Sequence, residues 1–350
     1  MHRIRHHDSR ALPPDAERTI HMLKKYWKHA LISVCVFLLA GAGYYIWSMY
    51  SSLSTLQKPP EASRFTPVVH RVPEKVNLEP PKWQGEERVN ILLLGGDSRG
   101  LEANEVPRSD SILLASFDPK TKRANLFSLL RDTYVDIPGF GKDRLNAALS
   151  YGGPELAMKT ASTLTGLDIQ YYVYTDFVGF IKLIDALGGV EFEVEKDMKY
   201  TSKADKHQYD IDLKKGKQLL NGETALMYAR FRYDAMSDYA RTQRQRELLG
   251  AVADKLKSTW NLLQLPSLIK EVSPYVETNL SADDIVKLAA LGYDSTIGAS
   301  HQLPPMDNVA DARINNAAVL KVIDDNQLKL YIQEALEVTD KPSVSETISQ

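Results

Sequence analysis

The chain has 350 residues, of which 43% are hydrophobic and 25% are charged, an ordinary composition for a globular protein of about two domains. Its formal net charge of -2 argues against a nucleic-acid-binding protein that works by charge alone, because such domains usually carry a clear basic excess. The single cysteine, Cys35, excludes both a disulfide framework and a thiolate metal site.

An apolar segment near the N-terminus predicts a membrane anchor. No Lys, Arg, Asp or Glu occurs between His29 and Gln57, and residues 30–49 are apolar enough to fill the ~20 positions that a bilayer core requires. The small residues at 40–42 resemble a signal-peptide cleavage site, so a cleaved signal peptide is the alternative. The apolar run continues through Trp47, which favours an uncleaved transmembrane helix over residues 30–49.

The segments on either side of this helix predict its orientation. Seven Lys and Arg side chains precede the apolar run, against three acidic ones, so the positive-inside rule places the basic tail of residues 1–29 in the cytoplasm. The rest of the chain would then lie outside the cytoplasm. Residues 50–88 contain six prolines among mixed charges, which predicts a semi-rigid stalk, with the folded part beginning near Val89.

After the stalk, short apolar runs alternate with helical patterns. Strands are expected over residues 89–96, 110–119, 123–131, 171–176 and 190–198, the second and third of them joined as a hairpin by DPKTK. Helices are expected over residues 146–165, broken at GGP, over 177–189, ended by two glycines, and over 239–262. This order predicts an α/β protein, with an α/β/α sandwich around a central mixed β-sheet in residues 89–260. Residues 261–350 are expected to be partly helical, with no assigned role.

The stretch ALMYARFRYDAMSDYARTQRQRELL, residues 225–249, contains five arginines. On a helix, Arg241 and Gln245 share one face, and Arg230 and Arg232 would point to one side if they lie on extended chain. Guanidinium groups present forked donors that match phosphate oxygens, so such convergence favours a phosphate or pyrophosphate site. The alternative is a solvated helix face with local ion pairs, such as one between Asp238 and Arg241.

Two aspartates follow or begin predicted strands. GGDSRG at residues 95–100 places Asp97 after a buried strand, although the lysine and hydroxyl of a P-loop are absent. Asp110 begins the next strand, and the pair would be flanked by Arg99 and Arg108 if the two strand ends meet. Carboxylates beside phosphate-binding arginines are typical of a Mg²⁺ site. A glycosidase also uses a carboxylate pair, and that alternative stays open at this point.

Further cations occur at Arg131, which ends a predicted strand, and at Arg144, each of which is equally compatible with an ordinary surface position. Residues 89–255 contain, in order, the motifs NILLLGGDSRG, RSDSILLASFDP, FSLLRDTYVDIPG, RLNAALSYGG, TDFVGFIKLIDALGGVE, GETALMYARFR and DYARTQRQRELL. Taken in this order, these motifs resemble the LytR-CpsA-Psr family.

The resemblance implies a phosphotransferase of the Gram-positive cell envelope. Such an enzyme moves an anionic glycopolymer, of the teichoic acid or capsular polysaccharide type, from a polyprenyl-pyrophosphate carrier to peptidoglycan. The implied metal ligands for Mg²⁺ are Asp97 and Asp110. The implied catalytic residues are Asp97, Arg99, Asp110 and Arg131, and the implied pyrophosphate-binding residues are Arg108, Arg131, Arg144, Arg230, Arg232, Arg241 and Gln245.

Two departures from the family pattern keep the charge but change its form. Arg144 stands where the family commonly has lysine, and Asp238-Tyr239-Ala240-Arg241 stands where members often read Asp-Phe-Gly-Arg. A non-catalytic sensor or transcriptional attenuator that binds the same lipid is the alternative function, as is a polyprenyl-pyrophosphate hydrolase. A cytoplasmic tail of residues 1–29 has no room for a helix-turn-helix domain, which weighs against direct DNA binding.

Overall fold

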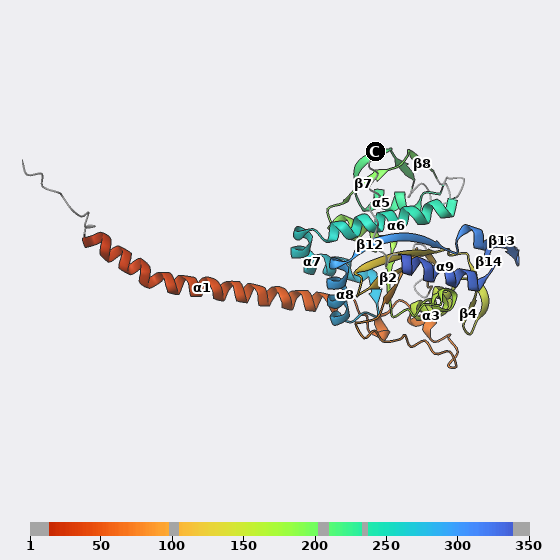
Figure 1. Ribbon diagram of the computed structural model, residues 1–350, viewed down its shortest axis with the longest axis horizontal. Helices are drawn as coiled ribbons and strands as arrows, with labels where there is room; N and C mark the ends of the chain where they lie inside the picture. The colour runs from red at the N-terminus through yellow and green to blue at the C-terminus, as the bar shows by residue number, and fades with distance from the viewer. Residues whose placement is uncertain (1–13, 98–104, 202–209, 233–236, 339–350) are drawn as a thin grey trace, which may run out of the picture. The chain divides into compact units, whose positions relative to one another are not determined.

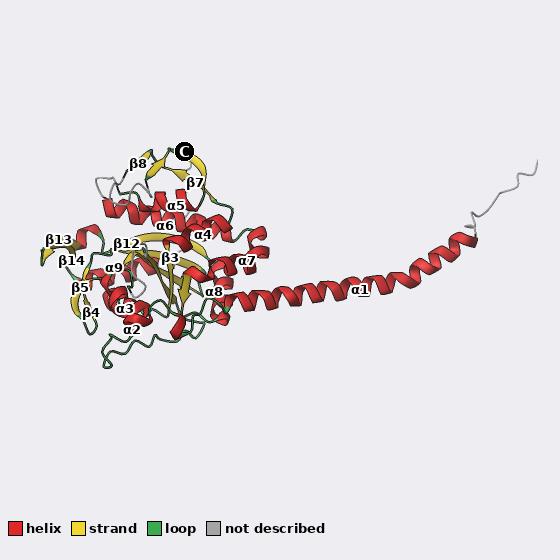
Figure 2. Cartoon of the chain, turned by 180° about the vertical axis from the view of Figure 1, so that it is seen from behind, coloured by secondary structure: helices red, strands yellow, loops and turns green. Residues whose placement is uncertain are grey.

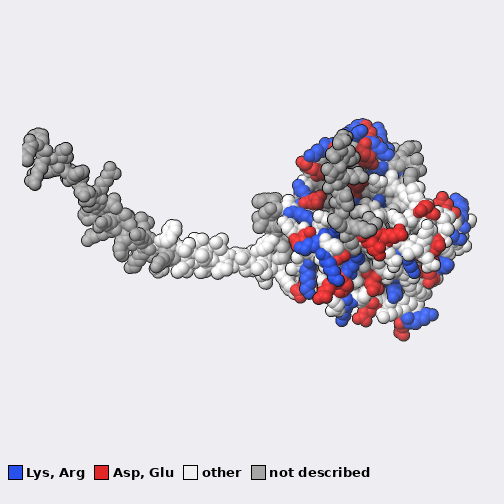
Figure 3. Space-filling model, in the orientation of Figure 1, with Lys and Arg blue, Asp and Glu red and all other residues white. Residues whose placement is uncertain are grey.

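The computed structural model describes residues 14–97, 105–201, 210–232 and 237–338 (Figure 1), and the chain separates into two units, residues 1–51 and 52–350. Helix α1 (Pro14–Leu53) makes up the described part of the first unit. Within it, His29–Leu53 is long and apolar enough to cross a membrane, and its most apolar window is not buried inside the protein. Figure 3 shows no charged side chain on the described apolar part of this helix. The predicted transmembrane segment, residues 30–49, lies within this span.

A six-stranded mixed sheet forms the centre of the second unit, in the order β11-β6-β1-β2-β3-β12. The β1/β6 and β3/β12 pairs are parallel, and the other three pairs are antiparallel. The strands are β1 (Val89–Gly96), β2 (Ser109–Asp118), β3 (Arg123–Leu129), β6 (Tyr171–Asp176), β11 (Val276–Thr278) and β12 (Thr296–Leu303).

Side chains alternate across this sheet, so each strand contributes to two layers. Leu92 and Leu94 of β1 are buried in a core with helices α2 (Thr66–Val69), α3 (Ala147–Thr165) and α9 (Asp325–Val338). Leu93 contributes to a cavity on the opposite face, beneath helices α4 (Phe177–Ala186), α5 (Gly222–Arg230) and α6 (Ser237–Leu256). Helices therefore cover both faces of the sheet, as Figure 2 shows, and the predicted α/β/α sandwich is confirmed.

The α4–α6 layer has a core of its own, distinct from the one under α3. It is made by these three helices together with α7 (Thr259–Val272) and two small antiparallel sheets. These sheets are formed by β7 (Val190–Val194) with β10 (Gly216–Leu220), and by β8 (Met198–Tyr200) with β9 (Ile211–Leu213). Because this layer has its own core, it can stand apart from the sheet and leave a cavity between them.

Local sequence signals placed several elements correctly. Strands β2 and β3 form the predicted hairpin, and helix α3 is broken at Gly152 and Gly153, where Gly153 has φ +80°. Glycine adopts this left-handed conformation without steric strain, so the chain can change direction before Pro154. Helix α6 begins near the predicted cap but ends at Leu256, and a second helix, α7, starts at Thr259.

The predicted stalk needs correction. Within residues 50–88, α1 extends to Leu53, a 3₁₀ turn spans Pro60–Ala62 and helix α2 packs on the sheet. Phe65 and Val68 are each only 1% exposed, and the Phe65 ring packs edge-on against Tyr174. The folded part therefore begins before Val89, because these apolar side chains complete the core.

The boundary expected at residue 260 is also wrong. Strands β11 and β12 form the two edges of the central sheet, and Leu328 and Ile332 of α9 are fully buried in its core. Residues 261–338 are thus part of the same domain. The remaining elements are β4 (Tyr134–Ile137), β5 (Gly141–Arg144), η2 (Ser273–Tyr275), α8 (Ala282–Asp294), η3 (Met306–Asn308), β13 (Val309–Ile314) and β14 (Ala317–Val322).

Candidate active site

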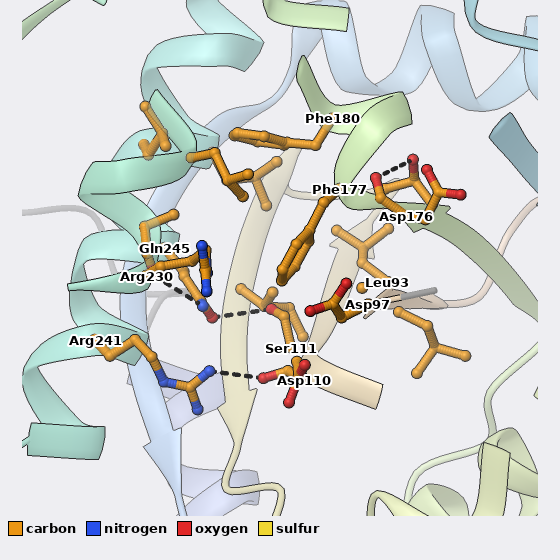
Figure 4. Close-up of a pocket in the computed structure, with 18 of the residues that line it drawn as sticks. Leu93, Asp97, Asp110, Ser111, Asp176, Phe177, Phe180, Arg230, Arg241 and Gln245 are labelled. Carbon is orange, nitrogen blue, oxygen red and sulfur yellow. Dashed lines mark hydrogen bonds between the residues drawn. The ribbon is translucent and has the colours of Figure 1, made fainter. Parts of the chain in front are cut away.

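A cavity of ≈ 620 Å³ lies between the central sheet and the layer of helices α4, α5 and α6. Much of its lining is apolar, with Leu93 and Val173 from the sheet and Phe180, Leu248 and Val252 from the helices. Charged side chains also line the cavity. Among the described lining residues, the arginines are Arg131, Arg230, Arg232 and Arg241, and the aspartates are Asp97, Asp110 and Asp176. The cavity thus combines an apolar wall with a charged region (Figure 4).

A β-bulge places the two predicted metal-site aspartates together. Gly96 of β1 pairs with Ser109, but its neighbour Gly95 pairs with Ser111, so Asp110 is an extra residue without a partner in the ladder. Bulges of this kind re-aim a side chain and occur next to active sites. Asp97 follows Gly96 directly, and both carboxylates line the cavity (Figure 4).

Asp110 is held by two arginines. Its carboxylate forms an ion pair with Arg131, and its backbone oxygen accepts a hydrogen bond from Arg241 Nη1 at 2.7 Å. Arg241 is itself fixed by Asp238, whose Oδ1 lies 3.0 Å from Nε and 2.9 Å from Nη2. The local Asp238–Arg241 pair therefore forms, and it orients a guanidinium that also faces the cavity.

The arginines of the cavity are crowded, and Arg241 is also desolvated. Arg241 is 3% exposed, and burial, reinforced by the positive charges of Arg232 and Arg131, lowers its pKa to about 10 despite the opposing effect of Asp238. Partial desolvation, and then the charge of Arg131, lower the pKa of Arg232, although its side chain keeps contact with solvent. These groups remain cationic at neutral pH, so the site concentrates positive charge in one cavity. An anionic ligand would relieve this repulsion.

Two other side chains shape the cavity between its charged and apolar parts. The guanidinium of Arg230, the last residue of α5, lies 5.3 Å from the centre of the Phe177 ring. Gln245 accepts a hydrogen bond from Ser111 Oγ at 2.9 Å and donates one to the backbone oxygen of Ala229 at 3.2 Å. Gln245 thus ties α6 to β2 and α5.

Comparison with known proteins agrees with the motif order. Residues 47–330 match the LytR_cpsA_psr family. The chain belongs to this family. It is 35% identical over 264 residues to the polyisoprenyl-teichoic acid–peptidoglycan teichoic acid transferase TagU of Enterococcus faecalis, covering 75% of this chain and 80% of that one. Over 200 residues it is 36% identical to the regulatory protein MsrR of Staphylococcus aureus, covering 56% of this chain and 58% of MsrR, a little over half of that relative's length.

A solved structure of a family member resembles the fold described above. The LytR-CPS2A-psr family protein YwtF (TagT), with bound octaprenyl pyrophosphate lipid, has a TM-score of 0.57 and 26% sequence identity, covering 78% of this chain and 98% of that chain. Family membership together with helix α1 indicates a single-pass membrane protein. Of these relatives, TagU is named for the transfer of teichoic acid to peptidoglycan, and the structure of YwtF (TagT) holds a polyprenyl lipid.

The structure brings most of the predicted site residues of this family member to one cavity. Asp97, Asp110, Arg131, Arg230, Arg232, Arg241 and Gln245 line it. Arg230 ends helix α5, so its approach to the cavity does not depend on the extended chain under which Arg230 and Arg232 would point to one side. Arg99 lies outside the described residues.

Two predicted phosphate ligands lie elsewhere. Arg108 is exposed and does not line the cavity; its charge instead acts on Asp143 and helps to lower the pKa of that carboxyl, in the β4–β5 region. Arg144 forms an ion pair with Asp132 at 3.4 Å, and Asp132 also approaches Arg131 at 3.5 Å. Arg144 is therefore linked to the cavity through Asp132 and Arg131, but its own side chain does not line the cavity.

Sequence reasoning missed Asp176 and Phe177 in the wall of the cavity. Asp176 caps helix α4 by accepting a hydrogen bond from Gly179 N at 2.8 Å, and Phe177 begins that helix. The sequence carried a signal for both, since TDFVG has an N-cap aspartate directly after a strand. The ion pair of Asp176 with Arg64, 3.1 Å apart and 112 residues away, had no such signal.

The donor set can be tested against Mg²⁺. Among the described residues there is no group of three or more His, Cys, Asp or Glu side chains arranged to hold a metal. Asp97 and Asp110 provide two carboxylates, and Mg²⁺ is commonly bound by one or two carboxylates while water and substrate phosphate complete its shell. The residues present therefore fit a magnesium ion that is bound together with a phosphorylated ligand.

Proposed function

We propose that this protein is a membrane-anchored phosphotransferase that moves an anionic cell-wall glycopolymer, of the teichoic acid or capsular polysaccharide type, from a polyprenyl-pyrophosphate carrier to peptidoglycan. The observation that supports this most directly is the single cavity in which an apolar wall continues into a cluster of arginines and aspartates. A polyprenyl pyrophosphate has the same two parts, a long apolar tail and an anionic head. The name of TagU and the lipid bound to YwtF (TagT) point to the same ligand class.

In this proposal the chain's residues bind and orient the donor. The prenyl tail lies against Leu93, Phe180 and Leu248, while the pyrophosphate faces Arg230, Arg232 and Arg241. The acceptor is a peptidoglycan sugar hydroxyl. Its oxygen attacks the polymer-side phosphorus, a new P–O bond forms, the bond to the bridging oxygen breaks, and polyprenyl phosphate leaves. The hydroxyl proton passes to Asp97 or Asp110.

Charge stabilisation is the main service that a protein can offer to such a transfer. The guanidinium of Arg241 is already desolvated and held in place, so it needs little reorganisation as negative charge shifts toward the leaving phosphate. Bound Mg²⁺, held by whichever of Asp97 and Asp110 does not accept the proton, would supply further neutralisation of the phosphate oxygens. Arg131 orients Asp110 for either role.

The test uses the full chain in detergent micelles, with a polyprenyl-pyrophosphate-linked glycan, Mg²⁺ and peptidoglycan oligomers, followed by mass spectrometry. We expect a phosphodiester-linked glycan–peptidoglycan product together with polyprenyl phosphate. The name of MsrR, a regulatory protein, favours a second candidate, a sensor or attenuator that binds the lipid without consuming it. Bound but unconsumed donor would support the sensor, and polyprenyl phosphate with free glycan would support a hydrolase.

The same proposal places the cavity outside the cytoplasm, with the N-terminus inside, in the envelope of a Gram-positive cell. The seven Lys and Arg residues before the apolar run of residues 30–49 support this orientation through the positive-inside rule. We expect external protease to shorten the chain in intact protoplasts while leaving an N-terminal epitope tag protected. Digestion of the N-terminal tag under those conditions would reverse the orientation.

A further inference from the structure

The arginine-rich stretch serves more than one place in the fold. Arg230, Arg232 and Arg241 reach the main cavity. Arg244 is occupied elsewhere: its Nε lies 2.7 Å from Glu195, and its Nη1 donates to the backbone oxygen of Phe231 at 3.0 Å. Arg246 belongs to neither group and lines a second cavity, and the function proposed above leaves it without a role.

This second cavity has a volume of ≈ 390 Å³ and lies between the C-terminal half of α6 and the edge of the central sheet. Edge strand β12 forms one wall. Ile297 pairs with Ala124 of β3, but the next pair is Ser300 with Leu126, so β12 carries one extra residue at this point. Such a bulge bends the strand locally, and Gly298 and Ser300 within it line the cavity.

Arg246 is a buried cation with two guanidinium nitrogens that lack hydrogen-bond partners among the described residues. The residue is 8% exposed, and neither its Nε nor its Nη1 has a hydrogen-bond partner in the described part of the chain. Burial lowers the pKa of Arg246, and the adjacent carboxylate of Glu247 opposes that effect only partly. A buried guanidinium with unsatisfied donors is unfavourable unless a ligand or water completes its contacts.

The other charged groups of the cavity limit the charge of such a ligand. Lys257 lies at the wall, where its Nζ donates to the backbone oxygen of Ser295 at 2.9 Å. Two carboxylates, Glu247 and Asp254, also line the cavity, although Glu247 accepts a hydrogen bond from Gln243 at 2.8 Å. Two cations against two carboxylates leave this lining with no net charge, and the carboxylates repel a dianion more strongly than a monoanion. A ligand held by Arg246 is therefore better matched with one negative charge than with two.

The size of the cavity and its donors favour a phosphodiester over a simple carboxylate. A volume of ≈ 390 Å³ equals that of roughly a dozen waters, at about 30 Å³ each. This leaves room for the groups on either side of a diester. Arg246 offers donors in a fixed planar fork, which matches phosphate oxygens, and the Ser300 hydroxyl can add another.

We propose that this second cavity is a binding site for a singly charged phosphodiester, with Arg246 as its principal ligand. The evidence for this site is its own geometry and does not depend on the function proposed above. If the proposed function also holds, the phosphodiester units of the anionic glycopolymer are the natural source of this ligand, and the cavity would hold the polymer on the opposite side of α6 from Gln245.

A histidine next to the cavity can report on binding. His301 Nδ1 lies 3.0 Å from Tyr331 Oη, and its ring stacks on Phe127 at 5.6 Å. Burial, and then the charge of Arg246, lower the pKa of His301. An anion bound to Arg246 would offset that charge and raise the pKa of His301. The imidazole resonance of His301 therefore measures occupancy without any need for catalytic activity.

The experiment titrates dimethyl phosphate into the full-length, histidine-labelled chain in micelles and follows His301 by NMR. We expect a saturable shift in the wild type, an affinity at least tenfold weaker in Arg246→Met, and intermediate binding in Arg246→Lys. Arg230→Met, a variant of the first cavity, should keep the His301 response while weakening the binding of octaprenyl pyrophosphate. Arg246→Met should weaken the His301 response while keeping the binding of octaprenyl pyrophosphate, and this contrast separates the two sites.

Thermal unfolding of Arg246→Met checks that the variant is folded, and we expect no loss of stability, because the lost guanidinium had unsatisfied donors. A wild-type His301 signal that dimethyl phosphate leaves unchanged would overturn the site. A response that persists in Arg246→Met would overturn the role of that residue. Acetate binding as tightly as dimethyl phosphate would overturn the assignment to a phosphodiester.

Discussion

Arg64 offers a sharp test of the finding that the segment after α1 belongs to the fold. Its Nε lies 2.8 Å from Glu277 Oε1, its Nη1 lies 3.1 Å from Asp176 Oδ2, and its guanidinium stacks on the Tyr174 ring at 5.0 Å. Burial disfavours the charge of Arg64, but Tyr174, Glu277 and Asp176 outweigh that effect and raise its pKa. Replacement by methionine would leave Glu277, which is 3% exposed, without its cation.

The expected loss can be worked out from these contacts. Removing one partner of a buried ion pair costs about 3–5 kcal/mol. The lower end applies here because the Arg64 side chain is 25% exposed, and because Glu277 keeps hydrogen bonds from Ser63 Oγ at 2.7 Å and from the Arg64 backbone N at 3.1 Å. A loss of about 3 kcal/mol corresponds to a fall in Tm of roughly 6 °C for a domain of this size.

Thermal unfolding of the full chain in micelles measures this shift. Arg71→Met, at an exposed arginine in the same segment, is the matched control and should unfold with the wild type. The double variant Arg64→Met/Glu277→Gln removes the buried charge of Glu277 and leaves only Asp176 without the cation of Arg64, so part of the lost stability should return. If Arg64→Met unfolds at the same temperature as Arg71→Met, the segment is a tether and our account of the domain boundary is wrong.

Three further predictions concern the cavity and Glu155, a half-buried acid of α3. Arg241→Met should lower kcat/KM for transfer by about 100-fold or more, as expected for the loss of one preorganised donor, whereas Arg313→Met, at an exposed site on β13, should leave the rate of transfer unchanged. Leu93→Lys puts a charge in the apolar wall, so it should weaken the binding of a long-chain polyprenyl pyrophosphate more than the binding of inorganic pyrophosphate. Equilibrium binding assays measure both affinities, and equal weakening of the two would argue against a tail site at Leu93. Burial raises the pKa of the Glu155 carboxyl, so the free energy of unfolding of the wild type should fall as the pH rises through that raised pKa. Glu155→Gln should be more stable than the wild type above the raised pKa and should match it below the ordinary carboxyl pKa. Urea unfolding at a series of pH values measures this difference, and parallel plots of stability against pH for the two proteins would contradict the prediction.

The sequence by itself determined the features that depend on neighbouring residues. The apolar run of α1, the β2–β3 hairpin, the break in α3 at Gly152 and Gly153, and the order of motifs that marks the family all rest on local patterns. Such patterns are readable because helix periodicity, turn chemistry and glycine conformation are properties of a few consecutive residues. They were sufficient to predict the sandwich and most of the charged residues that line the cavity.

Only the tertiary structure decided which distant segments meet. Arg64 contacts Glu277 across 213 residues, β11 and β12 join the sheet from beyond the expected boundary, and the bulge at Asp110 turns that carboxylate toward the cavity. The same packing sends Arg108 and Arg144 away from the cavity and assigns Arg241 and Arg246 to different cavities. Long-range pairing is selected by burial and hydrogen bonding over the whole domain, and short stretches of sequence carry little record of it.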